Sequence, residues 1–155
     1  MLRMIAQYSW CWASLSVLAL SCSSVGNTFV KYQGTSFSVA VPSTVRVSKS
    51  SPVEDFELYQ FSEQGEKLLE VYVGNHPNFP KSFPPSAVSD QIPINGLQAK
   101  IVRWRDQEGN MFCECLVQLG AEAAWPSLLH AKYTALSKDR AIIAERIISS
   151  VNRKL

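Results

Sequence analysis

Short runs in which apolar and polar residues alternate fill most of the chain between residues 29 and 135. Alternation with a period of two is typical of a β-strand that turns one face toward a core. The clearest such run is residues 111–119, whose apolar positions are Met111, Cys113, Cys115, Val117 and Leu119. We predict strands at residues 29–33, 37–41, 45–47, 56–61, 68–73, 97–105, 111–119 and 128–135.

Two of the connections between these runs have the composition of hairpin turns. Residues 62–67 contain Gly65 and residues 106–110 contain Gly109, and glycine adopts the positive φ that tight turns require. The run at residues 68–73 has large apolar side chains at both odd and even positions. A strand that is buried on both faces has this pattern, so we place it in the middle of the sheet.

The period changes from two to that of a helix after Ser137, which suits a helix N-cap, with Asp139 in the first turn. One apolar stripe follows, made of Ile143, Ala144, Ile147, Ile148 and Val151. An isolated amphipathic helix is marginal in water, so this one must cover another element. Residues 111–119 offer the most apolar face, and we predict that Cys113 and Cys115 lie beneath the helix.

These elements predict an α+β fold: one antiparallel β-sheet of about six to eight strands, covered by a C-terminal amphipathic helix. The length of 155 residues and the apolar fraction of 46% suit a single domain with a core of its own. We place that domain at residues 29–155.

The segment Gly74–Asp90 interrupts the alternation and contains four of the eight prolines in the chain. Proline fixes φ and lacks an N–H donor, so this segment is predicted to be a long loop. Its large side chains, with Trp125 in a second loop, make it the candidate partner-binding surface. The alternative is that the aromatic residues fold under the loop and cap one end of the core. The candidate binding residues are His76, Phe79, Phe83 and Trp125.

Residues 1–21 have the pattern of an export signal: Arg3 near the start, an apolar stretch, and a small residue before Cys22. The end of this segment resembles the lipobox of bacterial lipoproteins, in which the cysteine becomes the lipid-modified first residue. Ala19 stands where that motif usually has a large aliphatic residue. Ordinary cleavage after Ser21 and a retained N-terminal anchor are the alternatives. We predict lipidation at Cys22, a tether at residues 22–28, and a location on the periplasmic face of a membrane.

The charge of the chain gives no indication of a nucleic-acid partner. The formal net charge is +2 and the basic residues are scattered, apart from a local cluster of Lys100, Arg103 and Arg105. Such a cluster on a strand is typical of a solvated face.

No residue pattern predicts a catalytic site, a metal site or a cofactor. Cys113 and Cys115 lie two apart, so in a strand they point the same way about 6.6 Å apart along the chain, too far for an easy mutual disulfide. We interpret them as small core residues. The histidines, His76 and His130, have no partner at a catalytic or metal-binding spacing.

Three segments resemble the PsbP-like (Mog-type) family: residues 37–42 as an opening strand that ends in Pro42, residues 68–74 as a central strand, and residues 133–151 as the closing strand and helix. The resemblance implies an α/β fold and a non-enzymatic accessory or binding role. Many bacterial members are exported lipoproteins.

Three functions are compatible with these patterns. The leading prediction is an exported, lipid-anchored, non-enzymatic accessory or binding protein that binds another protein of the bacterial cell envelope. A second is an envelope immunity or inhibitor protein whose Gly74–Asp90 loop plugs a secreted toxin. A third is an enzyme that uses Cys113 or Cys115 with a histidine.

Overall fold

A computed structural model describes residues 28–53, 55–121 and 124–154. A large antiparallel sheet of seven strands has the order β3-β4-β5-β9-β8-β7-β6. A small sheet of three strands has the order β1-β2-β10. The large sheet consists of β3 (Val45–Val53), β4 (Phe56–Glu63), β5 (Glu66–Gly74), β6 (Val88–Ile94), β7 (Leu97–Arg105), β8 (Met111–Gln118) and β9 (Leu128–Leu136). The small sheet consists of β1 (Phe29–Gln33), β2 (Phe37–Pro42) and β10 (Asn152–Arg153).

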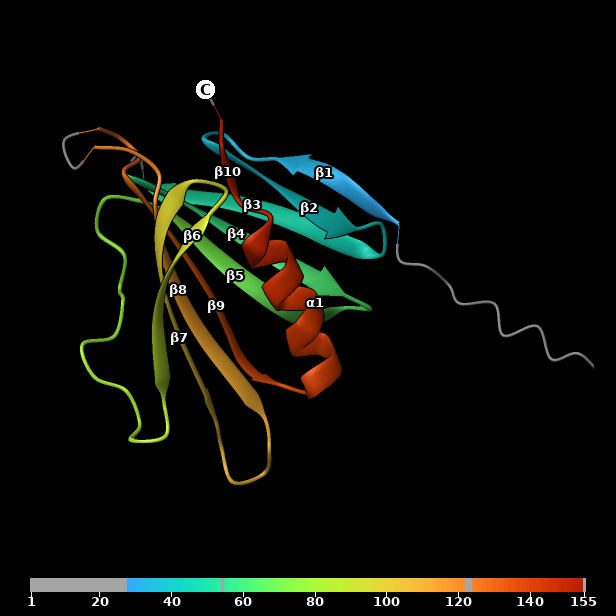
Figure 1. The fold of residues 1–155 in the computed structure, drawn as a ribbon. Coiled ribbons are helices and arrows are strands. Elements are labelled where there is room, and N and C mark those ends of the chain that lie inside the picture. The colour runs from blue at the N-terminus through green and yellow to red at the C-terminus, as the bar shows by residue number, and fades with distance from the viewer. Residues whose placement is uncertain (1–27, 54, 122–123, 155) are drawn as a thin grey trace, which may run out of the picture.

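The helix α1 (Lys138–Ser149) and the small sheet lie on the same side of the large sheet (Figure 1). The helix contacts β9, β5 and β8 of the large sheet and β2 of the small one. We call the side of the large sheet that faces α1 the helix face, and the opposite side the outer face. Among the described residues, no helix is long and apolar enough to cross a membrane.

The predicted antiparallel strands and the covering helix are observed, but the prediction of one sheet is wrong. The first two strands leave the large sheet and pair with each other, and β10 adds to the other edge of β2. Alternation shows that residues 37–41 form a strand, but it carries no information on which strand they pair with. The helix is also short, at 12 residues, so Val151 is buried just beyond its end.

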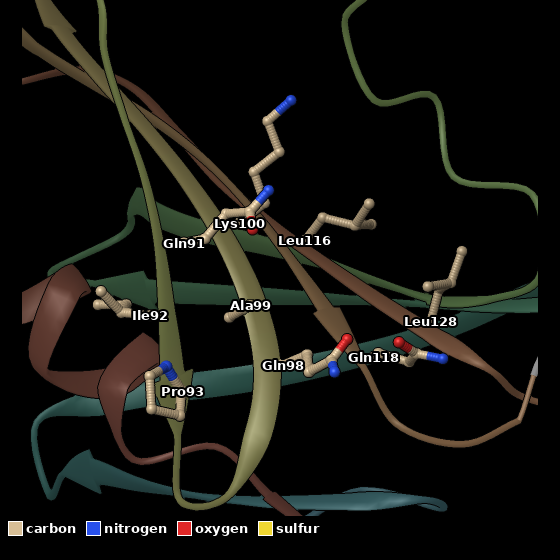
Figure 2. Close-up of a pocket in the computed structure, with 9 residues that line it drawn as sticks. All are labelled: Gln91, Ile92, Pro93, Gln98, Ala99, Lys100, Leu116, Gln118 and Leu128. Carbon is tan, nitrogen blue, oxygen red and sulfur yellow. The ribbon is translucent and has the colours of Figure 1, made fainter.

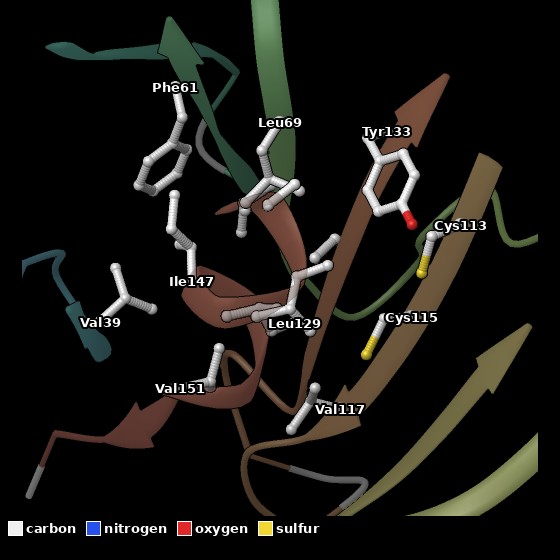
Figure 3. Close-up of a cluster of buried hydrophobic side chains, with 14 of the residues drawn as sticks. Val39, Phe61, Leu69, Cys113, Cys115, Val117, Leu129, Tyr133, Ile147 and Val151 are labelled. Carbon is white, nitrogen blue, oxygen red and sulfur yellow. The ribbon is translucent and has the colours of Figure 1, made fainter. Parts of the chain in front are cut away.

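The apolar stripe of the helix lies where the sequence predicts. Ala144, Ile147 and Ile148 are buried, whereas Ile142 on the opposite side is 58% exposed. Figure 3 shows Ile147 pointing between the two sheets, with Val39 of β2 on one side and Leu69 of β5 on the other. The helix therefore fills the space between the sheets rather than covering β8 alone. Cys113 and Cys115 are buried in the same core, as their packing interpretation predicts.

The strand β6 was not predicted. The predicted loop extends to Asp90, whereas the strand begins at Val88 and continues through Pro93 to Ile94. Proline is tolerated in an edge strand, and β6 is an edge of the large sheet. The loop that connects β5 to β6 is therefore limited to residues 75–87, which we call the proline loop.

A buried carboxylate, Glu57, ties the small sheet to the large one. Thr35, in the turn between β1 and β2, donates its hydroxyl to Glu57 Oε1 at 2.9 Å. Tyr59 donates its hydroxyl to Oε2 at 2.6 Å, and Lys49 Nζ lies 2.6 Å from Oε1. Burial opposes the charged form, but these three hydrogen bonds outweigh it and lower the pKa of Glu57 below its ordinary value.

Replacing Glu57 by Gln is expected to cost stability at neutral pH and progressively less in acid. Because the folded-state pKa is depressed, the contribution of Glu57 is complete above the unfolded-state pKa of about 4.5 and is lost as pH falls through the folded-state value. Urea unfolding of both proteins between pH 7 and pH 3 measures this difference, with the exposed Glu108→Gln as control. A difference that stays constant across this range contradicts the assignment.

Candidate functional site on the outer face

The outer face of the large sheet carries aromatic and charged side chains. Tyr72, His130, Leu116 and Lys100 lie side by side on β5, β9, β8 and β7, because each is the register partner of the next. A strand places alternate side chains on opposite faces, so these residues point away from the core beneath α1. The side chains of the outer face therefore do not take part in packing against the helix, so that packing does not explain why they are aromatic, apolar or charged.

The proline loop runs along this face, on the side away from α1 (Figure 1). Phe79 packs edge-on against the ring of His130, with the ring centroids 5.4 Å apart, and against Phe83 at 5.7 Å. Phe83 in turn packs on Trp104 at 5.7 Å, and Trp104 stacks on Phe112 at 5.3 Å. The proline loop contains no helix or strand, and this continuous aromatic chain holds it against the sheet.

Beneath Phe79 lies a buried polar pair on neighbouring strands. His130 Nε2 is hydrogen-bonded to Glu114 Oε2, and both residues are buried. Beside them Lys132 forms an ion pair with Glu70 at 3.0 Å. A buried pair of this kind needs its hydrogen bond, because either group alone would be desolvated without a partner.

A groove with a volume of about 450 Å³ opens on the outer face next to the proline loop. Figure 2 shows its residues spread across β6, β7, β8 and the start of β9. The apolar part of the lining includes Leu116 and Leu128, and Lys100 places its ammonium group 5.5 Å from the ring of Phe79. The polar lining consists mainly of neutral amides, from Gln91, Gln98 and Gln118. An apolar floor with a few polar groups at the rim is the usual composition of a binding site.

The predicted binding residues lie at two places. Phe79 and Phe83 are half-buried and fold under the loop, but they pack on the outer face and not on an end of the main core. His76 is exposed, and its backbone N–H donates to the Tyr72 hydroxyl at 3.2 Å. Cys22, the predicted lipidation site, lies outside the described residues.

Trp125 marks the second place, at one end of the proline loop. Its ring is 49% exposed, and Nε1 donates to the carbonyl of Asp55 at 3.0 Å. Two residues further on, Ser127 donates its N–H to Asn75 Oδ1 at 2.9 Å, and this bond fixes the start of the proline loop. The two candidate loops therefore meet at one end of the large sheet.

Most of the residues that line the groove were not predicted as binding residues. Leu116 can be recognised in the sequence, because the odd-numbered positions of its strand already form an apolar face and Leu116 is an apolar residue on the opposite face. The three glutamines cannot be recognised in this way, because glutamine is also common on strands that face only solvent. The pair of Glu114 and His130 depends on the register between β8 and β9, which the sequence does not contain.

The two cysteines lie on the helix face, away from this site. Burial raises the pKa of Cys115 to about 12. Burial, with the neighbouring Cys115, raises the pKa of Cys113 still further above that of a free thiol. Among the described residues, no three His, Cys, Asp or Glu side chains are placed to share a metal ion.

Neither thiol is expected to react with iodoacetamide in the native protein at pH 8, because the thiolate is the reactive form. Both should react within minutes after unfolding in guanidinium chloride. Mass spectrometry of the peptide that contains Cys113 and Cys115 measures the labelled fraction. Fast labelling of either cysteine in the native protein would revive a role as a nucleophile.

Comparison with known proteins gives no family: no protein-family model matches the chain, and no curated protein matches it.

Proposed function

We propose that this chain is an exported, lipid-anchored, non-enzymatic binding protein of the bacterial cell envelope, and that the outer-face groove holds part of a partner protein. The observation that carries the binding role is the groove itself, an apolar floor of Leu116 and Leu128 with amides at its rim. We further propose that residues 29–155 form a PsbP-like domain.

The composition of the groove favours binding over chemistry. Amide side chains donate and accept hydrogen bonds without titrating, so they suit recognition of peptide or other neutral polar groups. Among the residues that line the groove, Lys100 is the one ionisable group. The cysteines of a thiol-dependent enzyme would have to leave the core to act.

The aromatic side chains of the proline loop lie beside the proposed site. Phe79 and Phe83 are half-buried, and the backbone around them is interrupted by prolines rather than fixed in a sheet. Lys100 lines the groove and places its ammonium group over the ring of Phe79. Contact with a partner could therefore bury more of these rings without disturbing the core.

Export and anchoring are supported by the sequence of residues 1–22. Labelling cells with a palmitate analogue tests this part of the proposal. We expect label on the wild-type chain and none on the Cys22→Ala variant. A wild-type chain that stays unlabelled but is exported would replace the anchor with ordinary secretion.

Substitution of Gln118 by Trp tests the groove, because the new side chain would fill it. We expect recovery of the partner from cross-linked envelopes to fall about tenfold, which corresponds to the loss of about 1.4 kcal/mol of binding free energy. Gln60→Trp is the matched control, since Gln60 is also exposed on the outer face but lies on β4. Equal recovery with both variants contradicts the assignment of the groove.

A further inference from the structure

The strand β6 is an edge of the large sheet, and no strand among the described residues pairs with its outer side. It pairs with β7 through a two-residue turn at Asn95 and Gly96, whose φ values of 48° and 82° are both positive, as in a type I′ turn. In such a hairpin the flanking pair, Ile94 and Leu97, exchanges both of its backbone hydrogen bonds.

The alternation of an antiparallel ladder then fixes which peptide groups of β6 are free. Val88, Asp90, Ile92 and Ile94 bond to β7, whereas the N–H and C=O groups of Ser89 and Gln91 point to the open edge. Pro93 falls in the outward set, where the missing N–H costs no ladder bond. The edge therefore presents the N–H donors of Ser89 and Gln91 and the C=O acceptors of Ser89, Gln91 and Pro93, in the arrangement that an added strand needs.

Hollows lie beside this edge on both faces of the sheet. The outer-face groove includes Gln91 and Pro93, and a second cavity of about 220 Å³ on the helix face includes Ile92 and Ile94. An added strand would project alternate side chains toward these two hollows. On the helix face Val88 is 61% exposed and Ile92 is 43% exposed, although both are large and apolar.

Asp90 lies between Val88 and Ile92 on the same face of β6, and its charge indicates which side chain a partner strand should place there. Asp90 lies 3.6 Å from Arg103 Nη1, and the same guanidinium donates from Nε to Glu145 at 2.8 Å. The Arg103 guanidinium is thus shared by the carboxylates of Asp90 and Glu145, and the three side chains carry a formal charge of −1. Arg146, the other basic residue nearby, stacks over the ring of Phe29 with its guanidinium carbon 4.0 Å from the centroid.

We propose that β6 binds an extended segment of the partner protein as an added antiparallel strand. The segment has Lys or Arg opposite Asp90, and apolar residues two positions before and after it, opposite Val88 and Ile92. This inference rests on the proposed binding function, because β6 forms one wall of the groove. A second copy of the chain suits the edge less well: the register that pairs Val88 with Ile92 also sets Asp90 against Asp90, and like charges directly opposite are destabilising.

A synthetic peptide, Thr-Val-Thr-Lys-Thr-Val-Thr with a fluorescent label, tests the inference. Anisotropy should show binding, and the backbone amide signals of Ser89 and Gln91 should shift in NMR spectra. Methylating the backbone nitrogens of the two threonines that flank lysine removes their bonds to β6, and we expect affinity to fall about tenfold or more. The matched control methylates the lysine nitrogen, which points away from β6, and should change affinity less than about twofold.

On the protein side, Asp90→Asn should weaken the peptide about threefold, the range of a half-exposed ion pair. Equal affinity of the two methylated peptides, or a peptide that does not bind, overturns the inference. Either of these results is still compatible with the proposed function, provided that Gln118→Trp lowers recovery of the native partner. Dimers in sedimentation that are lost when Gln91 is replaced by Pro would also overturn it, in favour of a second copy at this edge.

Discussion

Replacing Ile147 by Asp is expected to prevent folding. Ile147 is fully buried between the helix and the two sheets, and Figure 3 shows it among Val39, Phe61 and Leu69. A carboxylate there would be desolvated with no partner, at a cost of several kcal/mol. The loss of the packed isoleucine adds about 2–5 kcal/mol. Together these approach the whole stability of a typical domain, about 5–15 kcal/mol.

Ile142→Asp is the matched control, because it makes the same change on the same helix at a side chain that is 58% exposed. Its stability should stay within about 0.5 kcal/mol of the wild type. Circular dichroism during thermal unfolding compares the two variants. A soluble Ile147→Asp protein with a cooperative transition near that of the wild type would refute the placement of the helix between the sheets.

The second large effect is expected at the buried pair of Glu114 and His130. Replacing His130 by Leu removes the hydrogen bond of a buried carboxylate, and should cost about 3 kcal/mol or more. Replacing both residues by leucine should cost less than the sum of the two single changes, since no polar group is then left unpaired. Urea unfolding of the two single variants and the double variant measures this coupling.

Lys132→Ala serves as the control for that cycle. Lys132 is on the same strand and outer face as His130, but its ion pair with Glu70 is partly exposed. Such pairs contribute at most about 1 kcal/mol. If the losses in unfolding free energy for Glu114 and His130 are additive, the two side chains are not energetically coupled. The packing of Phe79 on the His130 ring would then not depend on the hydrogen bond to Glu114.

Local patterns predict the elements of this fold well, because each depends on neighbouring residues. The stripe of Ala144, Ile147 and Ile148 needs only the helical period, and the apolar face of residues 111–119 needs only the strand period. The small sheet depends instead on long-range pairing: β10 reaches β2 only after the helix has returned the chain to its start. Alternation in residues 37–41 is the same whichever strand lies beside them.

The candidate site shows the same limit. Phe79, Phe83 and Trp125 stand out in sequence because large apolar residues are unusual in proline-rich loops. The outer-face groove was not predicted, because Leu116 and Leu128 become neighbours only through the register of β8 and β9. The edge strand was missed for a different reason: Pro93 argues against a central strand, and only the topology shows that β6 is an edge of the large sheet.

The claim that binding takes place on the outer face can be tested by position-specific photo-cross-linking in intact cells. A benzophenone side chain placed at Gln98, on the rim of the groove, should give one discrete adduct with a partner protein. The same side chain at Ile142, exposed on the helix, should give none. An adduct from Ile142 and none from Gln98 would contradict the account, and would place the binding surface on the helix side of the molecule.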